Sequence, residues 1–206
     1  METRRKNMPG DERRDLTVRT VVDLCAQQDP ATVTTASIAE RMGLTQGALF
    51  RHFRNKEAIW EGVAQWVSGR LMARLAAAAN PSAPPLEVLE RMFMAHIEFI
   101  ARHPGVPRLM LGQLQHGRST PARRVIDAML TRYRERLAAV LDAAAERGEV
   151  QDELDRDAAA TAFIGAIQGL VVQSMIAGDV KGIRALAPRV FALYRRGIAA
   201  GREEAK

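Results

Sequence analysis

The chain has very little cysteine, few aromatic residues and no alternating β-branched runs of the kind that form strands. Its single cysteine, Cys25, excludes an intrachain disulfide. Cys25 follows Val21, Val22 and Leu24 in an apolar segment, which favours a core position over a redox-sensing thiol. Glycine and proline group at the ends of periodic segments rich in Ala, Leu and Arg. These features predict an all-α fold.

The signatures of common catalytic and metal sites are also absent. The four histidines show no metal-ligand spacing, and no second cysteine can assist them. The sequence contains no Gly-x-Ser-x-Gly elbow and no glycine-rich phosphate loop after a strand. His96 falls on an apolar helix, where a hydrogen-bonded core histidine is commoner than a polar pocket group. We therefore expect no enzyme activity and no cofactor.

The most informative stretch is 34–57, which reads as two short helices joined by a tight turn. Thr34 stands where an N-cap is wanted. Gly43 follows the first helix, where a left-handed C-cap favours glycine. The residues between them place an apolar face on that helix through Ile38, Ala39 and Met42. This arrangement is typical of a helix-turn-helix, which presents its second helix to the major groove of DNA.

The second helix is expected to begin after Thr45, its N-cap, and to turn Leu49 and Phe53 inward. Its outward positions are Gln46, Gly47, Phe50 and Arg51. A glutamine can pair with an adenine edge and an arginine with guanine. Phosphate contacts, which fix register, are expected from Thr35, Thr45, His52 and Lys56. On spacing alone, two helices of an ordinary bundle with a solvated polar face remain an alternative.

This stretch resembles the DNA-binding domain of the TetR (tetracycline-repressor) family of bacterial regulators. The resemblance is carried at fixed spacing by Thr34, Ile38-Ala39, Gly43-Leu44-Thr45, Gly47-Ala48, Leu49-Phe50, His52-Phe53 and Lys56-Glu57. It implies phosphate contacts at Thr34, Thr35 and Thr45. It implies base-facing positions at Gln46, Gly47, Ala48 and Arg51, and backbone anchors at Phe50, His52 and Lys56.

Two departures from the family pattern stand out. Phe50 replaces the usual tyrosine, so a hydroxyl-to-phosphate bond is missing and only a van der Waals contact is expected there. Gln27-Gln28-Asp29-Pro30 replaces the usual glycine, flanked by aromatic residues, at the end of the first helix. This second departure concerns the packing of that turn more than DNA binding.

The formal net charge is +6, which suits a nucleic-acid partner without proving one. Arg4-Arg5-Lys6, followed by Arg13-Arg14, forms a basic start to the chain. A flexible arm of this kind can enter an adjacent minor groove. A disordered, solubilising tail explains the same residues equally well. Both interpretations stay open.

The coarse plan has nine helices and two domains. We expect 1–56 to hold the arm and the DNA-binding domain, and 57–206 to hold a ligand-binding and dimerisation domain. Breaks at 80–85 and 103–107 separate helices. The expected helices are 13–28, 34–42, 45–53, 57–79, 86–102, 107–115, 121–148, one capped by Asp155 or Asp157, and 183–200.

The run Ala158–Gly178 contains no charged residue and is about long enough to cross a membrane. Its many Ala, Gly and polar residues make insertion marginal. We expect it to pack on its own bundle on one side and on a second subunit on the other. The family resemblance likewise implies a homodimer through the last two helices, which would read a palindrome with half-sites about 34–36 Å apart, or a multiple of this.

We expect the bundle to hold a small apolar or amphipathic effector. Met and aromatic residues at helical spacing are more often plain core, so each candidate has that alternative. The candidate pocket walls are Trp66, Phe93, Ile97, Met110, Leu114, Met129, Tyr133, Phe163 and Gln168. The predicted function is a cytoplasmic, ligand-responsive repressor of a double-stranded DNA operator, with no membrane partner. The alternatives are an architectural DNA-binding protein without ligand and, more weakly, a bundle enzyme with a vestigial helix-turn-helix.

Overall fold

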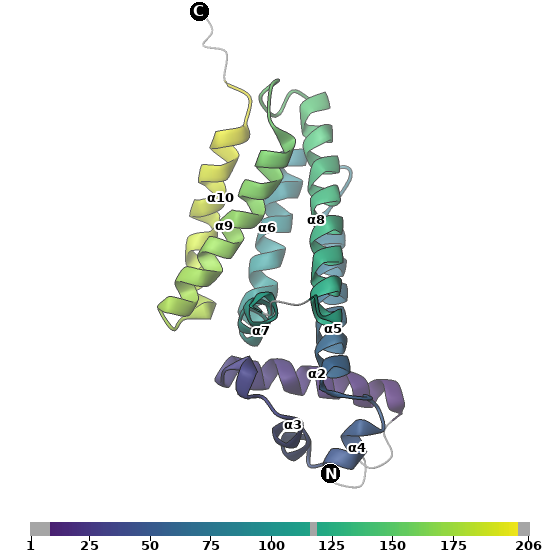
Figure 1. The fold of residues 1–206 in the computed structure, drawn as a ribbon. Coiled ribbons are helices and arrows are strands. Elements are labelled where there is room, and N and C mark those ends of the chain that lie inside the picture. Colours follow the sequence, from purple (N-terminus) through teal and green to yellow (C-terminus); the bar gives the residue numbers. More distant parts are fainter. Residues whose placement is uncertain (1–8, 116–118, 202–206) are drawn as a thin grey trace, which may run out of the picture. The chain divides into compact units, whose positions relative to one another are not determined.

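The protein, described by a computed structural model over residues 9–115 and 119–201, is built of helices (Figure 1). Over these residues there are nine α-helices and no strand, apart from one isolated antiparallel bridge between Val150 and Ala199. This confirms the predicted all-α fold. The α-helices are α2 (Gly10–Gln27), α3 (Thr35–Met42), α4 (Gln46–Phe50), α5 (Lys56–Ala78), α6 (Pro85–Arg102), α7 (Gly105–Leu114), α8 (Pro121–Glu146), α9 (Arg156–Ile176) and α10 (Ile183–Ile198).

Most helix ends lie where the sequence signals place them. The Asp155 side chain accepts a hydrogen bond from the backbone N–H of Ala158 at 2.9 Å and caps α9. Gly43 ends α3 with a φ of 67°, a conformation that costs a residue without Cβ least. Two short 3₁₀ turns, η1 (Pro30–Thr32) and η2 (Val180–Gly182), complete the described elements.

Two boundaries differ from expectation by three residues. Helix α2 begins at Gly10, three residues before the expected start at 13, and contains Arg13 and Arg14. Helix α4 ends at Phe50 because the backbone then turns tightly toward the buried Phe53. Asn55, beyond that end, caps α5: its side-chain oxygen accepts from the N–H of Ala58 at 2.8 Å. Arg4, Arg5 and Lys6 lie outside the described residues.

The chain forms two compact units, and each draws on two stretches of sequence. Unit 1 contains Met1–Arg70 and His103–Ala128, and unit 2 contains Leu71–Arg102 and Met129–Lys206. Helices α5 and α8 therefore contribute residues to both units. The expected domain boundary after residue 56 stays a prediction, because it concerns the end of the DNA-binding domain and not the compact units.

Unit 1 is organised around α2, which packs against α3 and α7. Its core contains Val21, Cys25, Ile38, Leu49 and Ile59, all essentially inaccessible to solvent. Burial and, to a smaller extent, the negative charge of Asp29 raise the pKa of Cys25 to about 12. The thiol is therefore protonated at neutral pH and occupies the core position that the sequence favours.

The contact between α2 and α7 depends on one glycine. A Cβ on Gly105, at the first position of α7, would overlap the Val22 carbonyl oxygen and crowd the backbone nitrogen of Ala26 at 2.7 Å. The start of α7 thus lies directly on the backbone of α2. Such an approach is open only to glycine, because every other residue carries a Cβ atom there.

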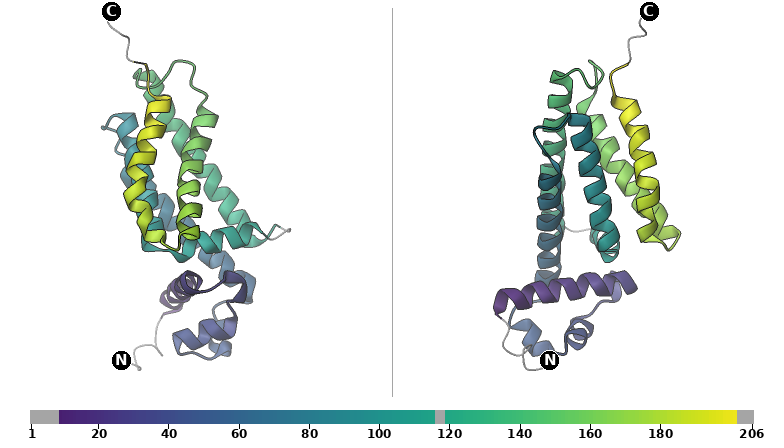
Figure 2. Two further views of the ribbon diagram at one scale, coloured as in Figure 1. Left: turned by 90° about the vertical axis from the view of Figure 1, so that its left-hand side faces the viewer. Right: turned by 180° about the vertical axis from the view of Figure 1, so that it is seen from behind.

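Unit 2 is a helical bundle in which α10 packs against α6 and α9 (Figure 2). Its centre is aromatic: the ring centroid of Phe93 lies 5.3 Å from those of both Phe163 and Phe191. Aromatic packing of this kind adds to the stabilisation from burial. At the surface of the bundle, Glu98 connects α6 to α10: its carboxylate accepts hydrogen bonds from Arg184 at 2.7 and 3.1 Å.

One polar pair lies within the unit 2 bundle. His96 Nδ1 and the Tyr133 hydroxyl are 3.3 Å apart and share a hydrogen bond. Although His96 keeps some accessible surface, desolvation of its ring lowers its pKa to about 4. Burial raises the pKa of Tyr133. His96 is thus a neutral, hydrogen-bonded core histidine at physiological pH.

Gly105→Ala is expected to destabilise the protein, because the added methyl cannot fit against the backbone of α2. Overpacking typically costs about 1–3 kcal/mol, and a backbone obstacle places this site at the upper end. Gly112→Ala, on the same helix, is the matched control, since its nearest neighbour would be Pro30 Cβ at an ordinary 3.7 Å. Urea unfolding of both variants tests this, and equal midpoints would contradict the close crossing.

His96 should make stability depend on pH between about 6.5 and 4. The unfolded chain binds a proton at the ordinary histidine pKa near 6.5, whereas the folded pKa is about 4. The contribution is therefore fully present above 6.5 and is lost as pH falls, by up to about 1.4 kcal/mol per pH unit. In His96→Gln, which keeps a hydrogen-bonding group, this part of the slope should vanish. Unfolding free energies of both proteins at about pH 7, 6, 5 and 4.5 test it.

Candidate nucleic-acid interface

Helices α3 and α4 form the expected helix-turn-helix, and both are held by threonine caps. Thr34 Oγ1 accepts from the Ser37 N–H at 3.0 Å, while Ser37 Oγ accepts from the Thr34 N–H at 3.0 Å. This reciprocal pair is a capping box. Thr45 Oγ1 accepts from the Ala48 N–H at 3.2 Å and caps α4. Each cap uses an oxygen lone pair and leaves the hydroxyl proton available to a phosphate.

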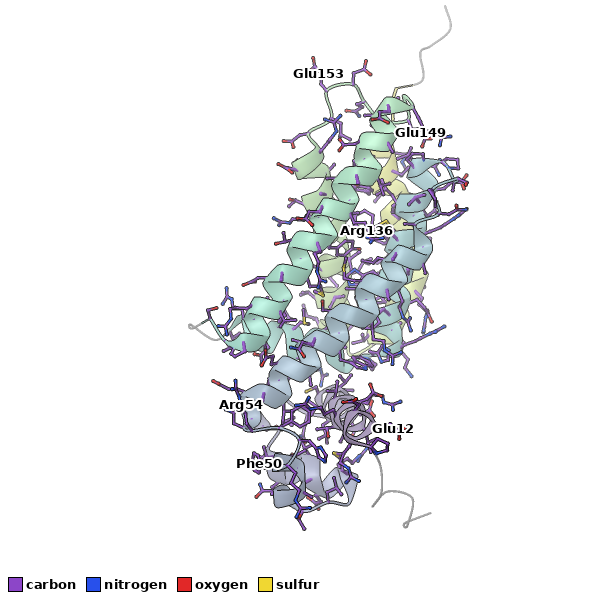
Figure 3. The ribbon with its side chains drawn as sticks, turned by 90° about the vertical axis from the view of Figure 1, so that its right-hand side faces the viewer. Glu12, Phe50, Arg54, Arg136, Glu149 and Glu153 are labelled. Carbon is purple, nitrogen blue, oxygen red and sulfur yellow. The ribbon has the colours of Figure 1, made fainter. Side chains whose placement is uncertain are left out.

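Helix α4 separates a buried side from an exposed side as the sequence predicts. Leu49 is buried in unit 1, as is Phe53 beyond the helix end, and Ala48 is partly buried. Phe50 leaves 42% of its surface exposed and lies at the outer surface of α4 (Figure 3). The exposed side carries Gln46, Gly47, Phe50 and Arg51. The four residues expected to face outward are therefore all accessible to a partner.

The Gln46 side chain is already oriented in the absence of DNA. Its amide nitrogen donates to Thr35 Oγ1 at 3.0 Å, from the start of α4 to the start of α3. A glutamine amide has two N–H donors and one carbonyl oxygen. The bond to Thr35 uses one donor and leaves one donor and one acceptor, which is the pair that an adenine edge requires. Thr35 thus has a positioning role that the sequence alone did not indicate.

The turn after α4 is fixed by a residue that sequence reasoning missed. Arg14 on α2 donates from Nε and Nη2 to the His52 carbonyl oxygen at 3.1 and 3.0 Å. Its guanidinium also lies 5.5 Å from the Phe53 ring centroid. No local pattern signals this bond, because the two residues are 38 positions apart. His52 is partly buried here, and Lys56 begins α5 with its amine 5.9 Å from the Trp60 ring centroid.

The nine candidate pocket residues do not form one group. Met110, Leu114 and Trp66 belong to unit 1, where Leu114 is 47% exposed and Trp66 donates its indole N–H to Asp15 at 3.0 Å. Gln168 is exposed on α9, because it lies on the face opposite the buried Ile167 and Leu170. The remaining five are buried in unit 2: Phe93, Ile97, Met129, Tyr133 and Phe163.

Helix α9 carries an exposed surface that has no charged residue after Asp157. Among the described residues it is the one helix whose length and composition would allow it to cross a membrane. Its inner face is buried through Phe163, but Val172 and Ile176 remain exposed on its outer face. On the adjoining α10, Leu186 and Leu193 are exposed as well. Less than half of the most apolar window of α9 is buried within the protein.

Comparison with known proteins gives the family. The sequence profile described as "Bacterial regulatory proteins, tetR family" matches residues 20–63, and "Tetracyclin repressor-like, C-terminal domain" matches residues 82–172. The first match contains α3 and α4, and the two together span more than half of the chain. The chain belongs to the TetR family. Its family and fold are those of DNA-binding transcriptional regulators and not of enzymes, and homodimers are typical of the family.

Curated relatives are distant but cover much of the chain. The nucleoid occlusion factor SlmA of Shewanella pealeana is 22% identical over 165 residues, which are 80% of this chain and 84% of that protein. SlmA of Vibrio vulnificus is 25% identical over 137 residues, 66% of this chain and 70% of that protein.

Solved structures share the fold at similarly low identity. The fatty acid degradation regulator FadR from Bacillus halodurans has a TM-score of 0.80 at 21% identity, covering 93% of this chain and 97% of that one. The ketosteroid transcriptional regulator KstR2 of Mycobacterium tuberculosis has a TM-score of 0.76 at 23% identity, with 92% and 96% covered. FadR from Bacillus subtilis in complex with stearoyl-CoA has a TM-score of 0.78 at 21% identity, with 89% and 98% covered.

Substitutions on this surface should separate base reading from phosphate contact. Gln46→Ala should relax preference at one base pair and cost about 1–3 kcal/mol for the selected duplex. Thr35→Val, which removes the acceptor that positions Gln46, should relax preference at the same base pair. Lys56→Ala should instead weaken all duplexes alike. Fluorescence anisotropy with the selected duplex and its single-base variants measures all three.

Thr35→Ser supplies the control, because it keeps the hydroxyl acceptor and should retain the preference. If Thr35→Val weakened every duplex equally, Thr35 would be a phosphate contact alone. If Gln46→Ala left the base preference unchanged, the reading face would be assigned wrongly.

Proposed function

We propose that this regulator is a repressor that binds a palindromic operator as a homodimer and is released by a small apolar or amphipathic effector. The observation that carries the proposal is the exposed side of α4, where Gln46 is held by Thr35 and Arg51 is open to solvent. One such helix reads few base pairs, so two copies related by a twofold axis are needed for a specific site.

We assign DNA contacts to ten residues by the chemistry that each one exposes. Base edges would be read by Gln46 and Arg51, with close approach at Gly47 and Ala48. Phosphates would be held by the hydroxyl protons of Thr34, Thr35 and Thr45, and by Phe50, His52 and Lys56 as backbone anchors. These roles separate sequence reading from sequence-independent affinity.

The dimer is proposed to form through α9 and α10. Their exposed face combines small residues with Val172, Ile176, Leu186 and Leu193, of which Ile176 is 82% and Leu193 62% exposed. Gly165 and Gly169 on α9 have no atom near their missing Cβ positions, so a partner helix could approach closely. On α9 this face carries no charged residue after Asp157, whereas on α10 the exposed Arg189 lies between the two leucines. An exposed apolar face of this kind marks a protein interface, and its burial against a second subunit would leave no need for a membrane partner. A cytoplasmic location follows from the DNA partner.

The effector is proposed to enter the unit 2 bundle. Phe93, Ile97, Met129, Tyr133 and Phe163 supply apolar walls, and the His96–Tyr133 hydrogen bond supplies a polar point. The solved relatives include a regulator in complex with stearoyl-CoA and one named for ketosteroids, which favours an apolar ligand. Such a ligand acts only if it binds one conformation better than the other.

Two alternatives can be distinguished from the proposed function by a selection experiment and a deletion strain. An architectural DNA protein would bind every duplex alike and lose nearly all affinity as salt rises. A role like that of the curated relatives, named nucleoid occlusion factors, would appear as altered cell division in a deletion strain. Selection from a random duplex pool should return one palindrome, and deletion of the gene should raise transcription of genes beside matching sites. Selection that enriched no sequence would overturn it.

Leu193→Arg is expected to break the dimer, because it places a charge in the exposed α9 and α10 face. The measured mass should fall from dimer to monomer at micromolar concentration, and affinity for the palindrome should drop about 100-fold or more. Ala139→Arg, an exposed position on α8, adds the same charge elsewhere and should change neither. Light scattering after size exclusion checks the mass. A dimeric Leu193→Arg protein would show that the interface lies elsewhere.

A further inference from the structure

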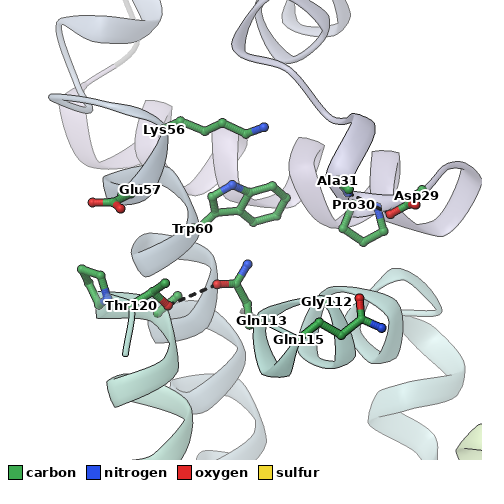
Figure 4. Close-up of a pocket in the computed structure, with 12 residues that line it drawn as sticks. Asp29, Pro30, Ala31, Lys56, Glu57, Trp60, Gly112, Gln113, Gln115 and Thr120 are labelled. Atoms are coloured by element: carbon green, nitrogen blue, oxygen red, sulfur yellow. Dashed lines mark hydrogen bonds between the residues drawn. The ribbon is translucent and has the colours of Figure 1, made fainter. Parts of the chain in front are cut away.

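Unit 1 contains a pocket of about 590 Å³ that the proposed function does not use (Figure 4). Four elements of unit 1 enclose it: the η1 turn, the first turns of α5, the end of α7 and the start of α8. Its volume lies within the range of sites that hold small molecules. It therefore has room for a small molecule, one far smaller than an acyl chain attached to coenzyme A.

The walls of this pocket are mostly apolar and include one large flat surface. Trp60 presents its indole from α5, and Pro30, Gly112 and Pro121 contribute from the other elements. The Lys56 amine lies 5.9 Å from the Trp60 ring centroid. A flat indole bordered by prolines favours a planar partner, because aromatic rings stack or meet edge-on.

The floor carries a polar group that is almost fully enclosed. Gln113 is only 5% exposed, and its side-chain oxygen accepts from the Thr120 hydroxyl at 3.4 Å. Its amide nitrogen has no hydrogen-bond partner among the residues that the structure describes, and it is directed to the side of Trp60 (Figure 4). Among the described residues no fully buried side-chain nitrogen or oxygen lacks a partner, so this nitrogen is still open to solvent. Its N–H donors are therefore available to an acceptor on whatever occupies the pocket.

The charges around the pocket select against an anionic ligand. Asp29 and Glu57 contribute two carboxylates and Lys56 one amine. Asp29 Oδ1 is engaged by the Ala31 N–H at 2.8 Å. The lining therefore has a net negative formal charge, which disfavours a ligand that carries a phosphate or carboxylate.

We propose that this pocket binds a neutral, planar aromatic molecule that stacks on Trp60 and accepts a hydrogen bond from Gln113 through a carbonyl or ring nitrogen. The site is separate from the bundle pocket proposed in unit 2. Its consequence rests on the proposed function: Lys56, a phosphate anchor there, borders the same ring. A ligand on Trp60 competes for the position of the Lys56 amine and lowers affinity for every duplex.

Binding can be read at the two tryptophans, which both lie on α5. In a ¹⁵N–¹H spectrum the two indole signals are assigned with Trp66→Phe, and three neutral carbonyl compounds are titrated: acridone, flavone and quinolin-2-one. At least one should shift the Trp60 signal and leave the Trp66 signal in place, with a Kd of about 0.1–1 mM. Gln113→Leu should weaken that binding about tenfold, and Gln113→Glu, which keeps the size but loses the donors, at least as much.

Gln27→Leu is the matched control, because Gln27 is exposed on α2 and absent from the pocket lining. Its titration should match that of the unaltered protein. No shift of the Trp60 signal with any compound, a shift of Trp66 alone, or equal affinity in Gln113→Leu would overturn the site. Circular dichroism of each variant shows that it is folded.

Two DNA-binding measurements distinguish this ligand site from the proposed function. Sequence preference measured without any compound tests the function alone. With the bound compound present, affinity for the selected duplex should fall about two- to tenfold in the unaltered protein, with less change in Lys56→Ala. A compound that occupies the site yet leaves operator affinity unaltered would overturn the competition with Lys56.

Discussion

Recognition of DNA depends on α4, a helix of five residues that must be held in place by contacts with the rest of unit 1. Helix α4 spans only Gln46–Phe50, far too short to be stable alone. Its position comes from the Thr45 cap, from the buried Leu49 and from Arg14, which fixes the backbone just after the helix. The exposed face can be open and polar because its orientation is determined by these contacts within the protein.

The rest of unit 1 is also held by contacts between segments far apart in the chain. Helix α2 supplies Arg14 on one side and receives α7 at Gly105 on the other. The far end of α7 carries Gln113, which lines the pocket beside Trp60. The reading helix and the pocket are thus parts of one packed unit, in which a tight backbone contact transmits displacement better than a flexible side-chain contact would.

Local chemistry made much of this fold predictable from the sequence. Caps such as Thr34 and Asp155 act within three residues, so the helix starts that depend on them could be read directly. Arg14 and Gly105 could not be found that way, because their contacts join segments far apart in the chain. Periodicity also identifies apolar positions without saying which core they join. For that reason the nine expected pocket residues divide between two units and an exposed helix face.

Two ligand sites would act on DNA binding by different physical routes. An effector in the bundle around Phe163 can act only by preferring one of two conformations, so tight binding alone would change nothing. In the proposed unit 1 site, a ligand on Trp60 would need no second conformation, since it would displace the Lys56 amine from its position 5.9 Å from the ring centroid. The first route can produce a large, cooperative response in a dimer, whereas the second is limited to the contribution of one phosphate contact. On these proposals, a ligand in the unit 1 pocket would adjust operator affinity, and an effector in the bundle would switch it.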